Sequence, residues 1–145
     1  MLLLDAGVWI AAVDPEDRCH SASRSLVLDS TLPAAAIDLT LYEVANVIGA
    51  RKHQQQLATR VGRSILERCG EHFVRIEAEL LEEMAGAIVE HGLTAYDAAY
   101  VAAARRHDWM LVSTDIKDLV SRELALAPDD PSIQPARDPG ASFNR

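Results

Sequence analysis

The sequence predicts an α/β domain with a central, mainly parallel sheet of about five strands flanked by helices. Two apolar runs, Leu2–Leu4 and Met110–Thr114, are typical of buried strands. Segments with apolar residues at helical spacing separate the expected strands, and this alternation is the pattern of a parallel α/β sheet. A chain of 145 residues is long enough for one such domain with its own core.

The expected elements follow one another from the N-terminus. Strands are expected over residues 2–4, 33–37, 73–76 and 110–114, and a last strand is hard to find in the sequence. Helices are expected over residues 8–13, 19–28, 40–53, 57–69, 80–91, 94–107 and 116–124. Pro15 ends the first of these helices, because proline disfavours a helical residue before it, and Gly70 and Gly92 end two later ones.

The C-terminal residues differ in composition from the rest of the chain. From Pro128 onward, four of the six prolines cluster with three aspartates. Such a segment contributes little to a core. We therefore expect one domain over residues 1–127, followed by an irregular tail over residues 128–145.

Composition excludes several classes of protein. No apolar stretch approaches the roughly 20 residues that a membrane span needs, and no basic segment precedes a signal-like run. Cys19 and Cys69 are the only cysteines, so neither a disulfide framework nor a structural zinc site is expected. The default location of such a chain is the reducing cytoplasm, and we expect no membrane association.

Charge is unevenly distributed along the chain. The net charge of −8 argues against a nucleic-acid partner. Between Leu41 and Arg75, however, three acids are outnumbered by six basic residues, namely Arg51, Lys52, Arg60, Arg63, Arg68 and Arg75. This segment is either a pair of solvated helices or a track for phosphate groups.

Four acids occupy equivalent structural positions. Asp5 and Asp115 directly follow expected strands, whereas Glu43 and Asp97 each lie three residues after a threonine and open a helix. The carboxyl ends of parallel strands and the starts of the following helices share one edge of a sheet, so the four acids should converge there. Clustered carboxylates repel one another, and the natural counter-charge for an all-oxygen site is Mg²⁺ or Mn²⁺.

Each acid also has a purely structural explanation. Thr-x-x-Glu and Thr-x-x-Asp resemble capping boxes, and Asp5 and Asp115 are both suited to cap the helices that follow them. Asp118 lies on the same helical face as Asp115, which makes it either a further candidate ligand or a solvated acid. Two of the acids also terminate the two best strands, and capping alone does not explain this.

Other conspicuous residues fit simpler roles. Trp9 and Trp109 are expected to pack in or at the edge of the core, and the five histidines show no spacing typical of a ligand set. Ser113 and Thr114 precede Asp115, where a hydroxyl is well placed to orient a carboxylate or a water. Gly7 is isolated, and the chain has no glycine-rich loop for phosphate binding.

With the acids placed, the chain resembles PIN-domain ribonucleases, specifically the VapC-type toxins of bacterial toxin–antitoxin systems. The resemblance extends from Met1 to about Leu126 and depends on four blocks of sequence: Leu3-Leu4-Asp5, the segment 41–46, the segment 92–104 and the segment 111–115. It implies a five-stranded parallel sheet, Mg²⁺-dependent endonuclease action on RNA, a homodimer and an inhibitory antitoxin protein. By similarity, the metal-binding acids are Asp5, Glu43, Asp97 and Asp115, and Asp118 matches a position that is acidic in some members only.

Two features limit the resemblance. The family often has a hydroxyl residue two positions after its first acid, where this chain has Gly7, and the proline-rich tail is outside the pattern. A degenerate PIN fold that only binds RNA or a protein partner is the main alternative. Haloacid dehalogenase and receiver-domain folds also place acids at strand ends. The first needs an acid at position 7, and the second needs a central acceptor aspartate and a late lysine on its own strand, so both rank low.

Overall fold

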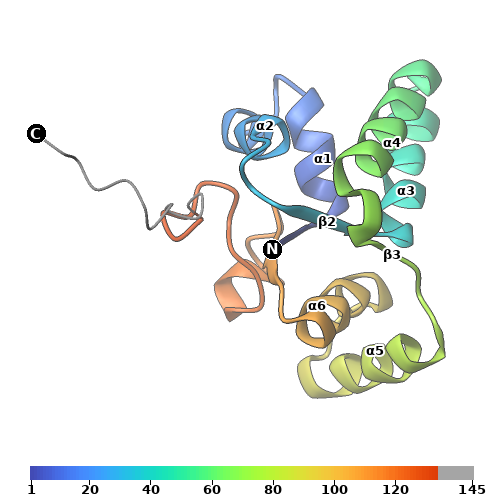
Figure 1. Cartoon of the computed structure of the whole chain (residues 1–145), viewed down its shortest axis with the longest axis vertical. Coiled ribbons are helices and arrows are strands. Elements are labelled where there is room, and N and C mark those ends of the chain that lie inside the picture. The colour runs from blue at the N-terminus through green and yellow to red at the C-terminus, as the bar shows by residue number, and fades with distance from the viewer. Residues whose placement is uncertain (134–145) are drawn as a thin grey trace, which may run out of the picture.

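The computed structural model describes residues 1–133 and contains a four-stranded, fully parallel sheet (Figure 1). The strands are β1 (Leu2–Leu4), β2 (Ala34–Ile37), β3 (Phe73–Val74) and β4 (Met110–Val112), and they lie side by side in the order β3-β2-β1-β4. The predicted fold class is confirmed, with one strand fewer than the expected five.

Helices connect consecutive strands. They are α1 (Ala6–Val13), α2 (His20–Leu28), α3 (Asp38–Val44), α4 (Gln55–Cys69), α5 (Ala78–His91) and α6 (Ala95–His107). A π-helical segment, η1 (Ala45–Arg51), continues α3, and two 3₁₀ turns, η2 (Gly70–His72) and η3 (Val120–Arg122), complete the described part of the chain. None of its helices is both long and apolar enough to cross a membrane.

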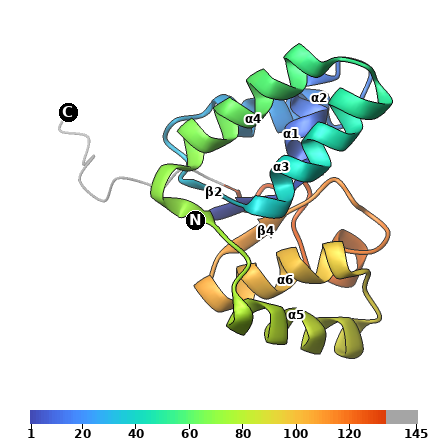
Figure 2. The ribbon, with the colours of Figure 1, turned by 90° about the vertical axis from the view of Figure 1, so that its right-hand side faces the viewer.

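The domain has three layers. Figure 2 shows α1 to α4 on one side of the sheet and α5 with α6 on the other. Successive strand residues point to opposite faces, so Leu3 and Leu111 pack toward α5 and α6, whereas Leu2, Leu4 and Val112 pack toward the other layer. Residues 98–104 of α6 are all buried, and their small side chains allow this helix to lie close to the sheet.

The predicted start and the predicted cap of the helix after β2 were both wrong. It begins at Asp38 rather than at Thr40, and its hydrogen-bonding pattern changes to that of a π-helix after Val44. Thr40 is therefore inside the helix, fully buried, and does not cap it. The capping-box interpretation of Thr40 and Glu43 is excluded by this geometry.

The helix predicted over residues 116–124 was also wrong. That segment forms turns and the 3₁₀ turn η3, because the chain must come back to β4, where Leu126 forms an isolated parallel bridge with Val112. The Leu126 amide donates to the carbonyl of Leu111, and the Ser113 amide donates to the carbonyl of Leu126. The missing fifth strand is reduced to this single bridge.

Residues 128–133 of the expected tail are described by the structure. Pro128 is buried and Ile133 packs against the core cluster on the α1 side of the sheet. The remaining residues of the expected tail, 134–145, lie outside the described part of the chain.

Candidate metal centre

Two strand ends place the first residues of the site. Leu4 of β1 pairs with Val112 of β4, so Asp5 and Ser113 follow at the same level on the carboxyl edge of the sheet. The carboxylate of Asp5 accepts a hydrogen bond from the Val8 amide at 3.0 Å, which caps α1, and it is also hydrogen-bonded to Ser113. Only 7% of Asp5 is exposed. The predicted capping role of Asp5 is confirmed, and the cap is buried beside β4.

Tyr100 of α6 joins three elements at this edge. Its hydroxyl donates to Glu43 Oε2 at 2.6 Å and accepts a hydrogen bond from the Ala6 amide at 3.2 Å. Because the single phenol proton goes to Glu43, the Thr40 hydroxyl at 3.1 Å must be the donor of the pair that it forms with Tyr100. These bonds fix the carboxylate of Glu43 on α3 against the starts of α1 and α6.

Asp97 lies in the first turn of α6, three residues before Tyr100 and on the same side of the helix. Thr94 is the N-cap residue of α6, and its hydroxyl oxygen accepts a hydrogen bond from the Asp97 amide at 3.2 Å. The Thr94 hydroxyl in turn donates to Asp97 Oδ2 at 2.7 Å. Thr94 therefore caps the helix and orients the carboxylate, and Asp97 itself makes no bond to the Thr94 amide of the kind a full capping box requires.

Asp115 is connected to the same edge through Ser113. Its amide donates to the Ser113 hydroxyl at 2.9 Å, and its carboxylate accepts from the Asp118 amide at 2.8 Å. Asp115 therefore caps a turn, although the helix expected after it does not form. Asp118 is exposed, and the structure places its backbone, rather than its carboxylate, in contact with Asp115.

Electrostatics link three of the acids directly. The pKa of Asp5 is raised to about 7, chiefly by burial and also by the negative charges of Glu43 and Asp97, while the hydrogen bonds from Ser113 and Val8 act in the opposite direction. The pKa of Glu43 is also raised, chiefly by burial and then by the charge of Asp97, while its bond with Tyr100 acts in the opposite direction. Asp5, Glu43 and Asp97 thus lie close enough together to repel one another.

The donor chemistry of this cluster fits a hard divalent cation. All three acids offer carboxylate oxygens, and within residues 1–133 none of them forms an ion pair with a basic side chain. In the same residues, no three acidic, histidine or cysteine side chains are near enough to enclose an ion by themselves. Mg²⁺ commonly takes only one or two carboxylates and keeps several waters, so this spacing remains compatible with it.

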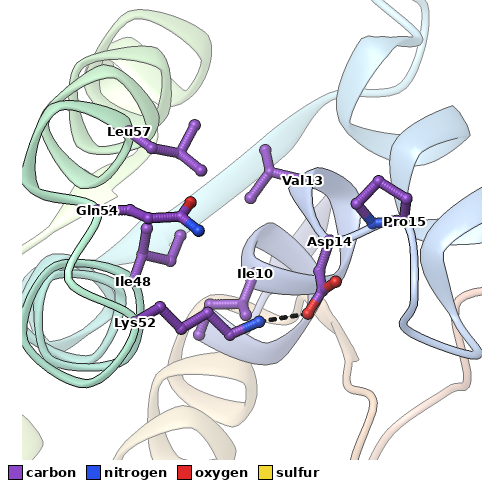
Figure 3. Close-up of a pocket in the computed structure, with 8 residues that line it drawn as sticks. All are labelled: Ile10, Val13, Asp14, Pro15, Ile48, Lys52, Gln54 and Leu57. Atoms are coloured by element: carbon purple, nitrogen blue, oxygen red, sulfur yellow. Dashed lines mark hydrogen bonds and ion pairs between the residues drawn. The ribbon is translucent and has the colours of Figure 1, made fainter.

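The basic segment over residues 41–75 is partly used within the fold. Lys52 forms an ion pair with Asp14, and both residues line a pocket of about 160 Å³, which Figure 3 shows between α1, η1 and α4. Arg68 donates to the carbonyls of Asp29 and Leu32 in the loop before β2. The pocket is lined by Ile10, Val13, Asp14, Pro15, Ile48, Lys52, Gln54 and Leu57, so it does not include any of the four acids.

Several other sequence predictions were tested by the structure. Trp9 is buried and Trp109 packs at the edge of the core, stacked on His107, as expected. Cys19 and Cys69 are free. Tyr100 and Thr40 were not singled out from the sequence as site residues. The available signal for Tyr100 was its position three residues after Asp97, which places both side chains on one face of a helix.

The carboxyl edge of this parallel sheet thus carries the buried Asp5 and the partly buried Glu43 and Asp97. Residues 2–121 match the model of the PIN domain, and the chain belongs to the PIN-domain family. The resemblance predicted from the sequence motifs is therefore confirmed.

One sequence relative and two solved structures are similar to the chain. It is 32% identical over 118 residues to Ribonuclease VapC3 of Pyrobaculum aerophilum, an alignment that covers 79% of this chain and 88% of that protein. The fold is similar to that of a toxin–antitoxin complex from Klebsiella pneumoniae, with a TM-score of 0.67, 20% identity, and coverage of 88% of this chain and 98% of that one. It is also similar to the sarcin–ricin loop cleaving toxin VapC20 of Mycobacterium tuberculosis, with a TM-score of 0.66, 18% identity, and coverage of 81% and 92%.

Proposed function

We propose that this chain is a divalent-metal-dependent endoribonuclease that acts as the toxin of a toxin–antitoxin pair. The observation that carries the proposal is the convergence of Asp5, Glu43 and Asp97 at one sheet edge without a basic partner among residues 1–133. The identity to a VapC ribonuclease supports the activity, and fold neighbours that are toxin–antitoxin complexes support an antitoxin partner.

Asp5, Glu43 and Asp97 are the residues that we expect to hold Mg²⁺ or Mn²⁺, with Asp115 and Asp118 as further candidates. The ion, when bound, supplies a water of lowered pKa and positive charge against the scissile phosphate of RNA. Tyr100, Thr94 and Ser113 hold these carboxylates in place through hydrogen bonds. The acids are thereby oriented before the ion and the RNA arrive, which lowers the cost of organising the site during the reaction. No protein nucleophile is required.

The RNA contacts, the oligomeric state and the compartment of this chain are also part of the proposal. Arg51, Arg60 and Arg63 are exposed on η1 and α4, and we expect them to contact phosphates of the RNA. We also expect a homodimer in solution, which light scattering measures directly. The two free cysteines fit a reducing compartment such as the cytoplasm.

Cleavage of single-stranded RNA by the purified chain tests the proposal. We expect cleavage with Mg²⁺ or Mn²⁺, its loss in EDTA and its return when excess Mg²⁺ is added. Asp97→Asn should abolish cleavage, whereas Asp108→Asn, the same change at the opposite end of α6, should leave it intact. Cleavage that persists in EDTA would contradict the metal requirement. Binding of RNA without cleavage by the unaltered chain would favour the degenerate, non-catalytic alternative.

A further inference from the structure

The backbone conformation at position 7 does not require the glycine that is found there. It lies in the first turn of α1, two residues after Asp5. Positive φ angles among the described glycines occur at Gly70 and Gly92, so Gly7 has a conformation open to any residue. Glycine inside a helix is less favourable than alanine. The reason for glycine at this position must therefore lie in the space around its Cα.

That space is occupied by a hydroxyl group from another element. A Cβ added to Gly7 would lie 2.2 Å from Thr114 Oγ1, far inside van der Waals contact, and 3.2 Å from Asp5 Oδ1. Thr114 directly follows Ser113, which is hydrogen-bonded to Asp5, and directly precedes Asp115. The hydroxyl of Thr114 and the carboxylate of Asp5 thus both border the space that a side chain at position 7 would fill.

We propose that Thr114 is a positioning residue of the metal centre and that glycine at position 7 admits its hydroxyl beside Asp5. This inference rests on the proposed function. Within residues 1–133, the Thr114 hydroxyl has no hydrogen-bond partner, so its proton is available to an oxygen that approaches Asp5. That oxygen belongs either to a water on the bound ion or to a phosphate of the RNA.

The proposal also accounts for the departure of this chain from its family. The sequence lacks the hydroxyl residue expected two positions after the first acid. Thr114, two residues beyond the end of β4, brings a hydroxyl to the same place, and the side chain at position 7 is correspondingly absent. The two positions are therefore expected to depend on each other.

A double-mutant cycle, measured by thermal melting in EDTA, tests that dependence. It requires neither a bound metal ion nor an assay of RNA cleavage. Gly7→Ala should lower the melting temperature by several degrees in the wild-type background, because the new methyl group displaces the Thr114 hydroxyl. In the Thr114→Ala background, the same change should not lower the melting temperature, since the space is then free and alanine suits the helix better. An equal effect of Gly7→Ala in both backgrounds would overturn the steric pairing.

The role of the hydroxyl is tested by Thr114→Val, which keeps the shape, and Thr114→Ser, which keeps the hydroxyl. We expect Thr114→Val to lower kcat/KM for RNA cleavage about tenfold or more and Thr114→Ser to retain it. Gly7→Ser combined with Thr114→Ala should recover part of the RNA cleavage activity that is lost when the Thr114 hydroxyl is removed. A Thr114→Val variant with wild-type kcat/KM would overturn the inference.

Two further readouts identify the oxygen that the hydroxyl contacts. A weaker affinity of Thr114→Val for Mn²⁺ in the absence of RNA supports a water on the ion, whereas an unchanged Mn²⁺ affinity with a raised KM supports a phosphate oxygen. If the wild-type chain does not cleave RNA, the proposed function fails, but the melting cycle and the Mn²⁺ titration still test Thr114. If the wild-type chain and Thr114→Val cleave equally well, the proposed function stands and this inference fails.

Discussion

Replacing Asp5 by asparagine separates the charge of this residue from its capping role. Asparagine keeps the size of the side chain and an oxygen that accepts the Val8 amide, so the cap of α1 should persist. The change removes the negative charge of a residue that is only 7% exposed and lies near Glu43 and Asp97. Without metal, we expect the variant to be more stable than the wild type at alkaline pH.

The pKa of Asp5 sets the magnitude and the pH window. Burial and its neighbours raise this pKa from 3.8 to about 7. The folded state therefore binds the proton more tightly than the unfolded state, and the unfolding free energy of the metal-free protein falls as the pH rises from about 4 to about 7. A shift of about three pKa units corresponds to at most about 4 kcal/mol, against a typical domain stability of roughly 5–15 kcal/mol. The raised pKa of Glu43 acts in the same direction.

Urea unfolding in EDTA at about pH 5 and pH 8 measures this effect. The stability of Asp5→Asn relative to the wild type should increase by about 2–3 kcal/mol between the two pH values, and Asp108→Asn, the control on α6, should show no such change. Added Mg²⁺ should stabilise the wild type at pH 8 but not Asp5→Asn. An Asp5→Asn variant that is less stable than the wild type at pH 8 in EDTA would refute the reasoning, because the buried charge would then be stabilising.

Four other substitutions test the hydrogen bonds and acids around the site. Tyr100→Phe removes the hydroxyl that contacts Glu43, and we expect a loss of about 1–3 kcal/mol of unfolding free energy by urea titration together with slower RNA cleavage. Thr94→Ala removes the cap of α6 and should cost about 1 kcal/mol but leave measurable cleavage. Asp118→Asn should weaken Mn²⁺ binding, measured by calorimetry, less than Asp115→Asn does, because the carboxylate of Asp115 is the one held within the turn.

Local patterns in the sequence were sufficient for the fold class. The apolar runs at β1 and β4 have few alternatives to buried strands, and their ends place Asp5 and Ser113 at one edge. The alanine-rich segment of α6 also predicts a helix packed against the sheet. Asp97 follows from its position in the first turn of that helix. These features depend on spacing within about 15 residues, which periodicity reports directly.

Features that depend on distant contacts were not predictable in the same way. Thr40 resembled a helix cap, but a buried hydrogen bond with Tyr100, 60 residues away, keeps it inside α3. The segment after Asp115 has helical spacing, yet the pairing of Leu126 with β4 forces it into turns. The reason for Gly7 is likewise a contact with Thr114, which no local pattern reports.

The central claim is that Asp5, Glu43 and Asp97 form one site for a divalent cation. A calorimetric titration of the metal-free chain with Mn²⁺ tests this claim most directly. We predict saturable binding to the wild type and to Asp108→Asn with the same affinity, and a large loss of binding in Asp5→Asn and in Asp97→Asn. Equal binding by all four proteins would contradict the account, because the ion would then be held elsewhere on the chain.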